Sequence, residues 1–62
     1  MRLSISSTYK HHRNCTIKYT FSDGSTILWN NATGGVKEWN GCSERVLDIR
    51  ISLIHEYEME DY

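Results

Sequence analysis

The feature that most restricts the fold of this chain is the alternation of apolar and polar residues in short runs. From Cys15 to Phe21 every second residue is apolar or aromatic, and the residues between them are polar. A period of two places successive side chains on opposite faces of a β-strand, whereas a helix repeats every three to four residues. The pattern predicts a strand with one buried and one solvated face. No apolar run is long enough for a membrane span or the core of a signal peptide, so we expect a cytoplasmic protein.

A turn separates this strand from the next one. A two-residue loop at Asp23-Gly24 would set Tyr19 opposite Leu28, which mixes the two faces. A three-residue loop, Ser22-Asp23-Gly24, with the glycine at positive φ, brings aromatic and β-branched side chains together on one face instead. We therefore predict the three-residue loop. Its register pairs Tyr19 with Ile27 and Ile17 with Trp29.

Two further segments alternate in the same way. Residues 2–9 predict a first strand, and residues 46–54 predict a fourth strand rather than a helix. Residues 10–14 are polar and predict a solvated connection. The glycine- and asparagine-rich segment 31–44 predicts a connection with at most one short helical turn around residues 36–40. The acidic tail, residues 56–62, is expected to fray.

These predictions combine into one domain, residues 1–62, of the mainly β class. We expect a small antiparallel sheet of about four strands, either open or curled into a small barrel, with at most one short helix in 31–44. A single alanine and no proline among 62 residues agree with few helices. Eleven residues are expected to face the core: Leu3, Ile5, Ile17, Tyr19, Phe21, Ile27, Trp29, Leu47, Ile49, Ile51 and Leu53.

The apolar face of such a sheet needs a cover, and the rest of the chain offers little. Ser7 and Tyr9 share the predicted inner face of the first strand, and Val36 and Trp39 are the only large apolar residues of segment 31–44. We therefore expect closure into a barrel, a lid formed by that segment, or burial against a second copy or another protein. A homodimer through the sheet face or edge is one of these expectations.

The charge of the chain argues against two classes of function. Seven lysines and arginines oppose eight aspartates and glutamates, which disfavours both a DNA-binding protein held by bulk positive charge and an acidic mimic of DNA. The charges are unevenly distributed, because residues 1–30 carry a net +3 and residues 45–62 carry a net −3. An acidic-aromatic tail of this kind suits docking on a basic surface of a partner.

The sequence does not predict a catalytic or metal site. Two cysteines without a secretion signal are expected to stay reduced. A zinc site would need the following residues, and only their first three have the usual close spacing: His11, His12, Cys15, Cys42 and His55. No nucleophile motif or phosphate-binding loop is present, and the carboxylates are concentrated in the tail. We expect no enzymatic activity, no cofactor and no metal.

A small chain with a sheet, no catalytic group and a polar-aromatic surface resembles the early proteins of bacteriophages that inhibit host defences, including anti-CRISPR proteins. The hairpin residues 18–25, Lys-Tyr-Thr-Phe-Ser-Asp-Gly-Ser, are similar to hairpins of some acidic members. The resemblance implies a viral inhibitor that acts in the host cytoplasm. The high negative charge of the DNA-mimicking members is missing here, so that mechanism is not implied.

The sequence thus predicts a small protein that binds a host or viral protein stoichiometrically and inhibits a defence or nucleic-acid-processing protein. Aromatic and arginine side chains outside the core are the expected anchors. The predicted partner-binding residues are Lys37, Trp39, Arg50, Tyr57, Glu58 and Tyr62, with Arg50 on the outer face of the fourth strand. The alternative is a small β-barrel that binds single-stranded nucleic acid. Its predicted residues are Lys10, His11, His12, Arg13 and Lys18.

Overall fold

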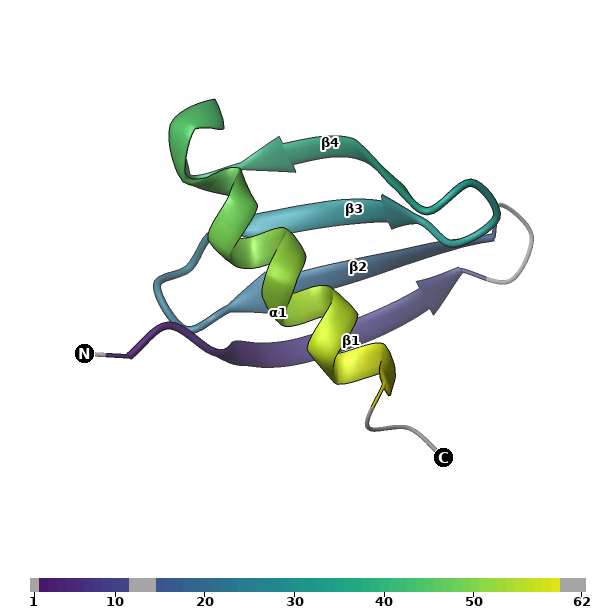
Figure 1. The fold of residues 1–62 in the computed structure, drawn as a ribbon, viewed down its shortest axis with the longest axis horizontal. Coiled ribbons are helices and arrows are strands. Elements are labelled where there is room, and N and C mark those ends of the chain that lie inside the picture. Colours follow the sequence, from purple (N-terminus) through teal and green to yellow (C-terminus); the bar gives the residue numbers. More distant parts are fainter. Residues whose placement is uncertain (1, 12–14, 60–62) are drawn as a thin grey trace.

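The computed structural model of the chain describes residues 2–11 and 15–59 (Figure 1). Four antiparallel strands form one sheet in the order β1-β2-β3-β4, and a helix crosses one of its faces. This confirms the predicted class, a mainly β fold with a four-stranded antiparallel sheet, but the α-helix does not lie in segment 31–44, where at most one short helix was predicted. The sheet is open, with β1 and β4 at its edges, and is not a barrel. The elements are β1 (Ile5–His11), β2 (Thr16–Phe21), β3 (Thr26–Asn30), β4 (Gly35–Asn40), a 3-10 helix η2 (Glu44–Val46) and α1 (Leu47–Met59).

The central hairpin has the predicted register. Ile17 pairs with Trp29, and Tyr19 pairs with Ile27. The Phe21 N–H donates to the Ser25 carbonyl at 2.9 Å, which closes a three-residue loop around Gly24. That glycine has a φ of 91°, a conformation that a residue with a Cβ rarely adopts.

The prediction of a fourth strand over residues 46–54 is wrong, because this stretch forms η2 and most of α1. Its apolar residues fit two periods at once. They alternate, but Leu47, Ile51 and Ile54 also recur at spacings of four and three, which is the core stripe of a helix. Residues 56–59 form the last turn of α1, whereas residues 60–62 lie outside the described part of the chain.

The fourth strand lies instead in the segment predicted as a connection. Residues 35–40 form β4, not a helical turn. Val36 pairs with Trp29 and Glu38 with Leu28, so Lys37 is the extra residue of a β-bulge. The bulge lets both Val36 and Trp39 pack against the core, and this breaks the period of two that identifies strands in a sequence.

A second bulge changes the face that part of β1 presents. The register shifts between Ile5 and Ser7, after which Thr8 lies opposite Tyr19 and Tyr9 lies opposite Lys18. Tyr9 is therefore on the outer face and 63% exposed, so the prediction that it shares the inner face with Ile5 is wrong. The strand also extends through Lys10 and His11, which were predicted to lie in a loop.

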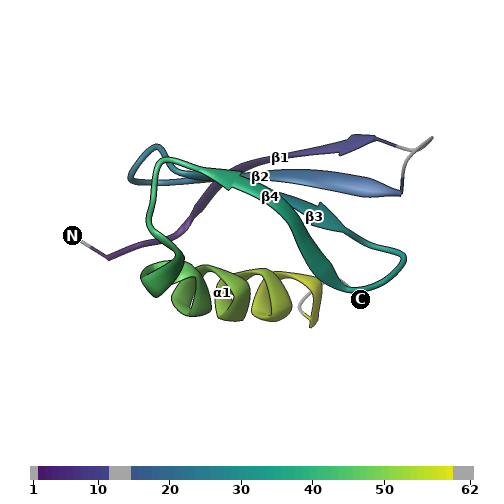
Figure 2. The ribbon, with the colours of Figure 1, turned by 90° about the horizontal axis from the view of Figure 1, so that it is seen from above.

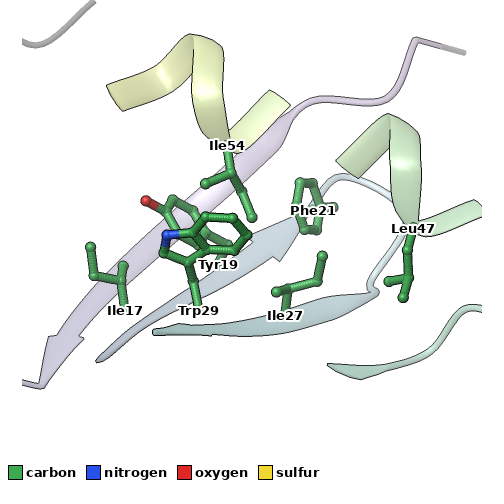
Figure 3. Close-up of a cluster of buried hydrophobic side chains, with 7 residues drawn as sticks. All are labelled: Ile17, Tyr19, Phe21, Ile27, Trp29, Leu47 and Ile54. Carbon is green, nitrogen blue, oxygen red and sulfur yellow. The ribbon is translucent and has the colours of Figure 1, made fainter. Parts of the chain in front are cut away.

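The apolar face of the sheet is covered by α1, which crosses it diagonally (Figures 1 and 2). Of the eleven predicted core residues, six are buried, four are half-buried against the core, and Ile49 is exposed. Figure 3 shows how Ile54 and Leu47 of the helix face the aromatic residues of the sheet. The buried hydrophobic residues are Ile17, Tyr19, Phe21, Ile27, Trp29, Leu47 and Ile54.

A buried arginine fastens the helix to the β2–β3 turn. Arg50 is only 6% exposed, so the prediction that it lies on an outer face is wrong. Its Nε donates to Ser25 Oγ at 3.0 Å, its Nη1 to the Val46 carbonyl at 2.8 Å and its Nη2 to Asp23 Oδ2 at 2.5 Å. Asp23 Oδ1 in turn accepts hydrogen bonds from the backbone N–H and the hydroxyl of Ser25. The network fixes the N-terminal half of α1 on the sheet.

This network predicts an acid transition. Hydrogen bonds from Ser25, followed by the ion pair with Arg50, lower the pKa of Asp23 from its ordinary value of 3.8 to about 2. A carboxylate with a lowered folded-state pKa stabilises the fold above its ordinary pKa, and this contribution is lost as the pH falls toward 2. The measurement is the free energy of unfolding in urea, compared between the wild type and Asp23→Asn from pH about 5 to about 2. We expect a smaller loss in the variant, and parallel losses would contradict the network's role.

Tyr19 gives a second pH prediction, at the alkaline end. Its hydroxyl is buried and makes no hydrogen bond of ordinary geometry within the described ranges, although the Glu58 side chain lies close enough to act on it as an acceptor. Burial, reinforced by the nearby Glu58 carboxylate, raises the pKa of Tyr19 to about 12. The neutral form therefore stabilises the fold below the ordinary pKa of about 10, and this contribution is lost as the pH rises toward 12.

A spectrophotometric titration of phenolate formation tests this assignment. We expect a late phenolate transition in the wild type that is missing from Tyr19→Phe. Because the substitution removes an unpaired buried hydroxyl, the variant should be as stable as the wild type or more stable by about 1 kcal/mol. A clear loss of stability would show that the hydroxyl has a partner.

Candidate functional site

The most unusual surface of the molecule is a second apolar stripe on the helix. Val46, Ile49, Leu53 and Tyr57 recur at spacings of three, four and four residues, so they lie along one flank of η2 and α1. This flank lies beside the one that covers the core, and Leu53 is half-buried where the two meet. Val46 is 36% exposed, Ile49 is 58% exposed and Tyr57 is 44% exposed.

The stripe borders two adjoining grooves beside the N-terminal segment and β1. We call this surface the α1–β1 seam, formed by Leu3, Ile5, Val46, Ile49, Leu53 and Tyr57. One groove, of about 340 Å³, is lined by Arg2, Leu3, Ser22, Asp23, Val46, Ile49 and Arg50. The other, of about 310 Å³, is lined by Ser4, Ile5, Leu53, Glu56 and Tyr57. Both are open to solvent, so the seam is an open surface rather than an enclosed cavity.

Contacts with the rest of the fold hold the seam in place at both ends. The ring of Tyr57 stands edge-on to buried Tyr19, with 6.0 Å between the ring centroids. At the other end, Arg50 ties the helix to Asp23, one of the residues that line the first groove. Rigid side chains lose little conformational entropy when they bind, which makes them good anchors for a partner.

The predicted partner-binding residues are divided between two edges of the sheet. Tyr57 belongs to the seam, and Glu58 is half-buried beside Tyr19. Lys37 is exposed on β4, and half-buried Trp39 donates its indole N–H to the Cys42 carbonyl at 3.1 Å. Tyr62 lies outside the described residues, and Arg50 holds the helix from within. The structure therefore does not gather these residues into one site.

Sequence reasoning missed Val46 and left Ile49 in the core. The signal was available, because the spacing of Val46, Ile49, Leu53 and Tyr57 is helical. It was masked by the alternation over residues 46–54, which assigned Val46, Ile49 and Leu53 to a strand, while Tyr57 was assigned to the tail.

The face of the sheet that carries no helix is polar. A row across the four strands joins Tyr9, Lys18, Leu28 and Glu38. A groove of about 260 Å³ on this side is lined by Lys18, Thr26, Leu28, Glu38, Trp39 and Asn40. Of the residues predicted to bind nucleic acid, Lys10 and Lys18 are exposed and His11 ends β1, whereas His12 and Arg13 lie outside the described ranges. Lys18 and Glu38 lie in the same row of paired residues, so this face carries a negative charge as well as a positive one.

The described residues do not form a metal centre. No group of three or more His, Cys, Asp or Glu side chains gathers among residues 2–11 and 15–59. Cys15 and Cys42 are free thiols, and they lie at opposite ends of the sheet, next to the start of β2 and the end of β4.

No helix in the described part of the chain combines the length and apolar composition needed to cross a bilayer. Comparisons with known proteins add no further assignment. No family model, curated protein or solved structure matches this chain.

Proposed function

We propose that this protein is a small protein-binding module whose contact surface is the α1–β1 seam. The observation that carries the proposal is the exposed apolar stripe, with Ile49 at its centre. A soluble domain rarely leaves contiguous aliphatic and aromatic side chains in water unless they bind something. The seam is continuous across the N-terminal segment, β1 and α1.

The shape and chemistry of the seam favour a macromolecule over a small ligand. Its grooves are shallow, and its anchors are aliphatic residues with one aromatic ring. Small-molecule sites are usually enclosed pockets with a few converging polar groups. Protein interfaces combine an apolar centre with a charged rim, and Arg2 and Glu56 provide such a rim here.

The biological form of this binding is a further part of the proposal. The resemblance to phage anti-defence proteins implies inhibition of a host defence or nucleic-acid-processing protein in the cytoplasm. A rigid surface on a chain of 62 residues suits such stoichiometric inhibition, because it needs contact area and no catalytic pocket.

The substitution Ile49→Asp tests the seam. Ile49 is largely in water, so the change should cost the fold only about 0.5 kcal/mol through helix propensity. It places a charge in the centre of the proposed interface. We expect unchanged circular dichroism and loss of binding through the seam, measured as capture of proteins, further copies of this chain included, from a lysate of the cell that makes it.

The matched control is Tyr9→Ser, which removes an equally exposed side chain from the opposite face of the sheet. It should capture the same proteins as the wild type. Capture that survives Ile49→Asp and fails with Tyr9→Ser would place the interface on the sheet instead.

One observation favours the nucleic-acid alternative, since exposed Tyr9 pairs with Lys18 on an open sheet face. Such an aromatic-basic pair can stack and neutralise a single strand. Anisotropy of a labelled single-stranded oligonucleotide at low salt tests it. Because Glu38 shares the row with Lys18, we expect no binding. Binding that falls steeply with added salt and is abolished in Tyr9→Ser would support this alternative.

A further inference from the structure

The exposed side of η2 and α1 has a charge pattern that is complementary to itself. Arg45 stands at its beginning and Glu56 near its end, with Ile49 and Leu53 between them. All four residues follow one another at spacings of three or four, so they lie along neighbouring lines of the helix surface. Arg2, in the groove beside Ile49, adds a second positive group at the first end.

Such a pattern matches its own copy when the copy is turned around. If two α1 helices pack antiparallel, residue numbers that face each other have a constant sum. Placing Ile49 opposite Leu53 then sets Val46 opposite Glu56 and Arg45 opposite Tyr57, so each Arg45 lies next to the partner's Glu56. The two-fold axis makes both ends of the contact equivalent, as an isologous interface requires.

We propose that the occupant of the α1–β1 seam is a second copy of this chain, with the two α1 helices packed antiparallel about a two-fold axis between Ile49 and Leu53. This inference rests on the proposed function, because it names the partner of the same surface. The parallel arrangement is excluded by charge, since it would bring like charges together at both ends.

The remaining charges and sizes on the helix agree with this contact. Asp48 and His55 lie on the flank turned away from the seam, by their spacing from Ile49 and Leu53. Ser52, three residues after Ile49, is small and exposed, so it leaves room beside Ile49 for a second helix. The pairing would bury Val46, Ile49 and Tyr57, the three seam residues most exposed in the single chain.

A charge swap tests the arrangement. Arg45→Glu and Glu56→Arg each replace an attractive contact by a repulsive one at both ends of the interface, and their combination restores attraction. Each change also improves the charge at its end of α1, whose last turn carries no basic residue. Loss of association therefore cannot be ascribed to unfolding, and circular dichroism verifies this.

Sedimentation equilibrium of the full chain gives the readout. We expect a dimer for the wild type, about tenfold weaker association for each single variant, and recovery in the double variant. Ile49→Asp should be monomeric. The control is Lys37→Glu, which makes the same charge change as Arg45→Glu but at an exposed residue of β4. It should leave the dimer unchanged.

Three outcomes would overturn the inference. A monomeric wild type whose capture of another protein depends on Ile49 would leave the seam as an interface and give it a different occupant. A dimer that withstands Ile49→Asp would move self-association elsewhere. Failure of the double variant to recover would reject the antiparallel pairing. If Ile49→Asp changes neither association nor capture, the proposed function fails as well.

Discussion

The structure depends on the burial of one sheet face beneath a single helix. Tyr19, Phe21, Ile27 and Trp29 present a continuous apolar surface on β2 and β3, and α1 is the element that removes it from water. Four strands about 4.8 Å apart span a face wider than the roughly 10 Å diameter of a helix. One helix therefore covers the middle of the sheet and cannot cover both margins. The α1–β1 seam lies along the side of the helix that borders the N-terminal segment and the start of β1.

The position of the helix on that face is decided by polar contacts as well as apolar ones. Arg50 is buried with its donors directed to Ser25, Asp23 and Val46, and its guanidinium lies 5.9 Å from the centre of the Phe21 ring. Polar contacts are directional, whereas apolar burial is not, so they fix which helix face meets the sheet. Gly41, directly after β4, allows the chain to pass close to Ser25, because a Cβ at this position would stand 2.9 Å from the Ser25 Cα. The chain thus leaves β4 close to the turn that the arginine binds.

These constraints connect the fold to the proposed interaction. Once Arg50 and the core stripe fix the helix rotation, Val46, Ile49, Leu53 and Tyr57 have to lie on its uncovered flank. The exposed stripe follows from helical geometry, because the apolar residues of α1 occupy more of its circumference than the sheet can contact. A second surface is needed to bury them, and a rotated copy of the same flank offers matching charges.

The sequence by itself determined the pairing of two strands that follow each other directly and are joined by a short turn. The β2–β3 hairpin could be derived in full, since the loop length, Gly24 and the alternation of both strands agree on one register. Only the tertiary structure decided the state of residues 46–59, because their apolar residues suit a strand and a helix equally well and the uncovered sheet selects the helix. It also decided the two bulges, which place Tyr9 on the outer face against the expected alternation and let Trp39 pack against the core. Arg50 shows the same limit, since a charged residue is assigned to the surface until partners as distant along the chain as Asp23 and Ser25 are brought beside it.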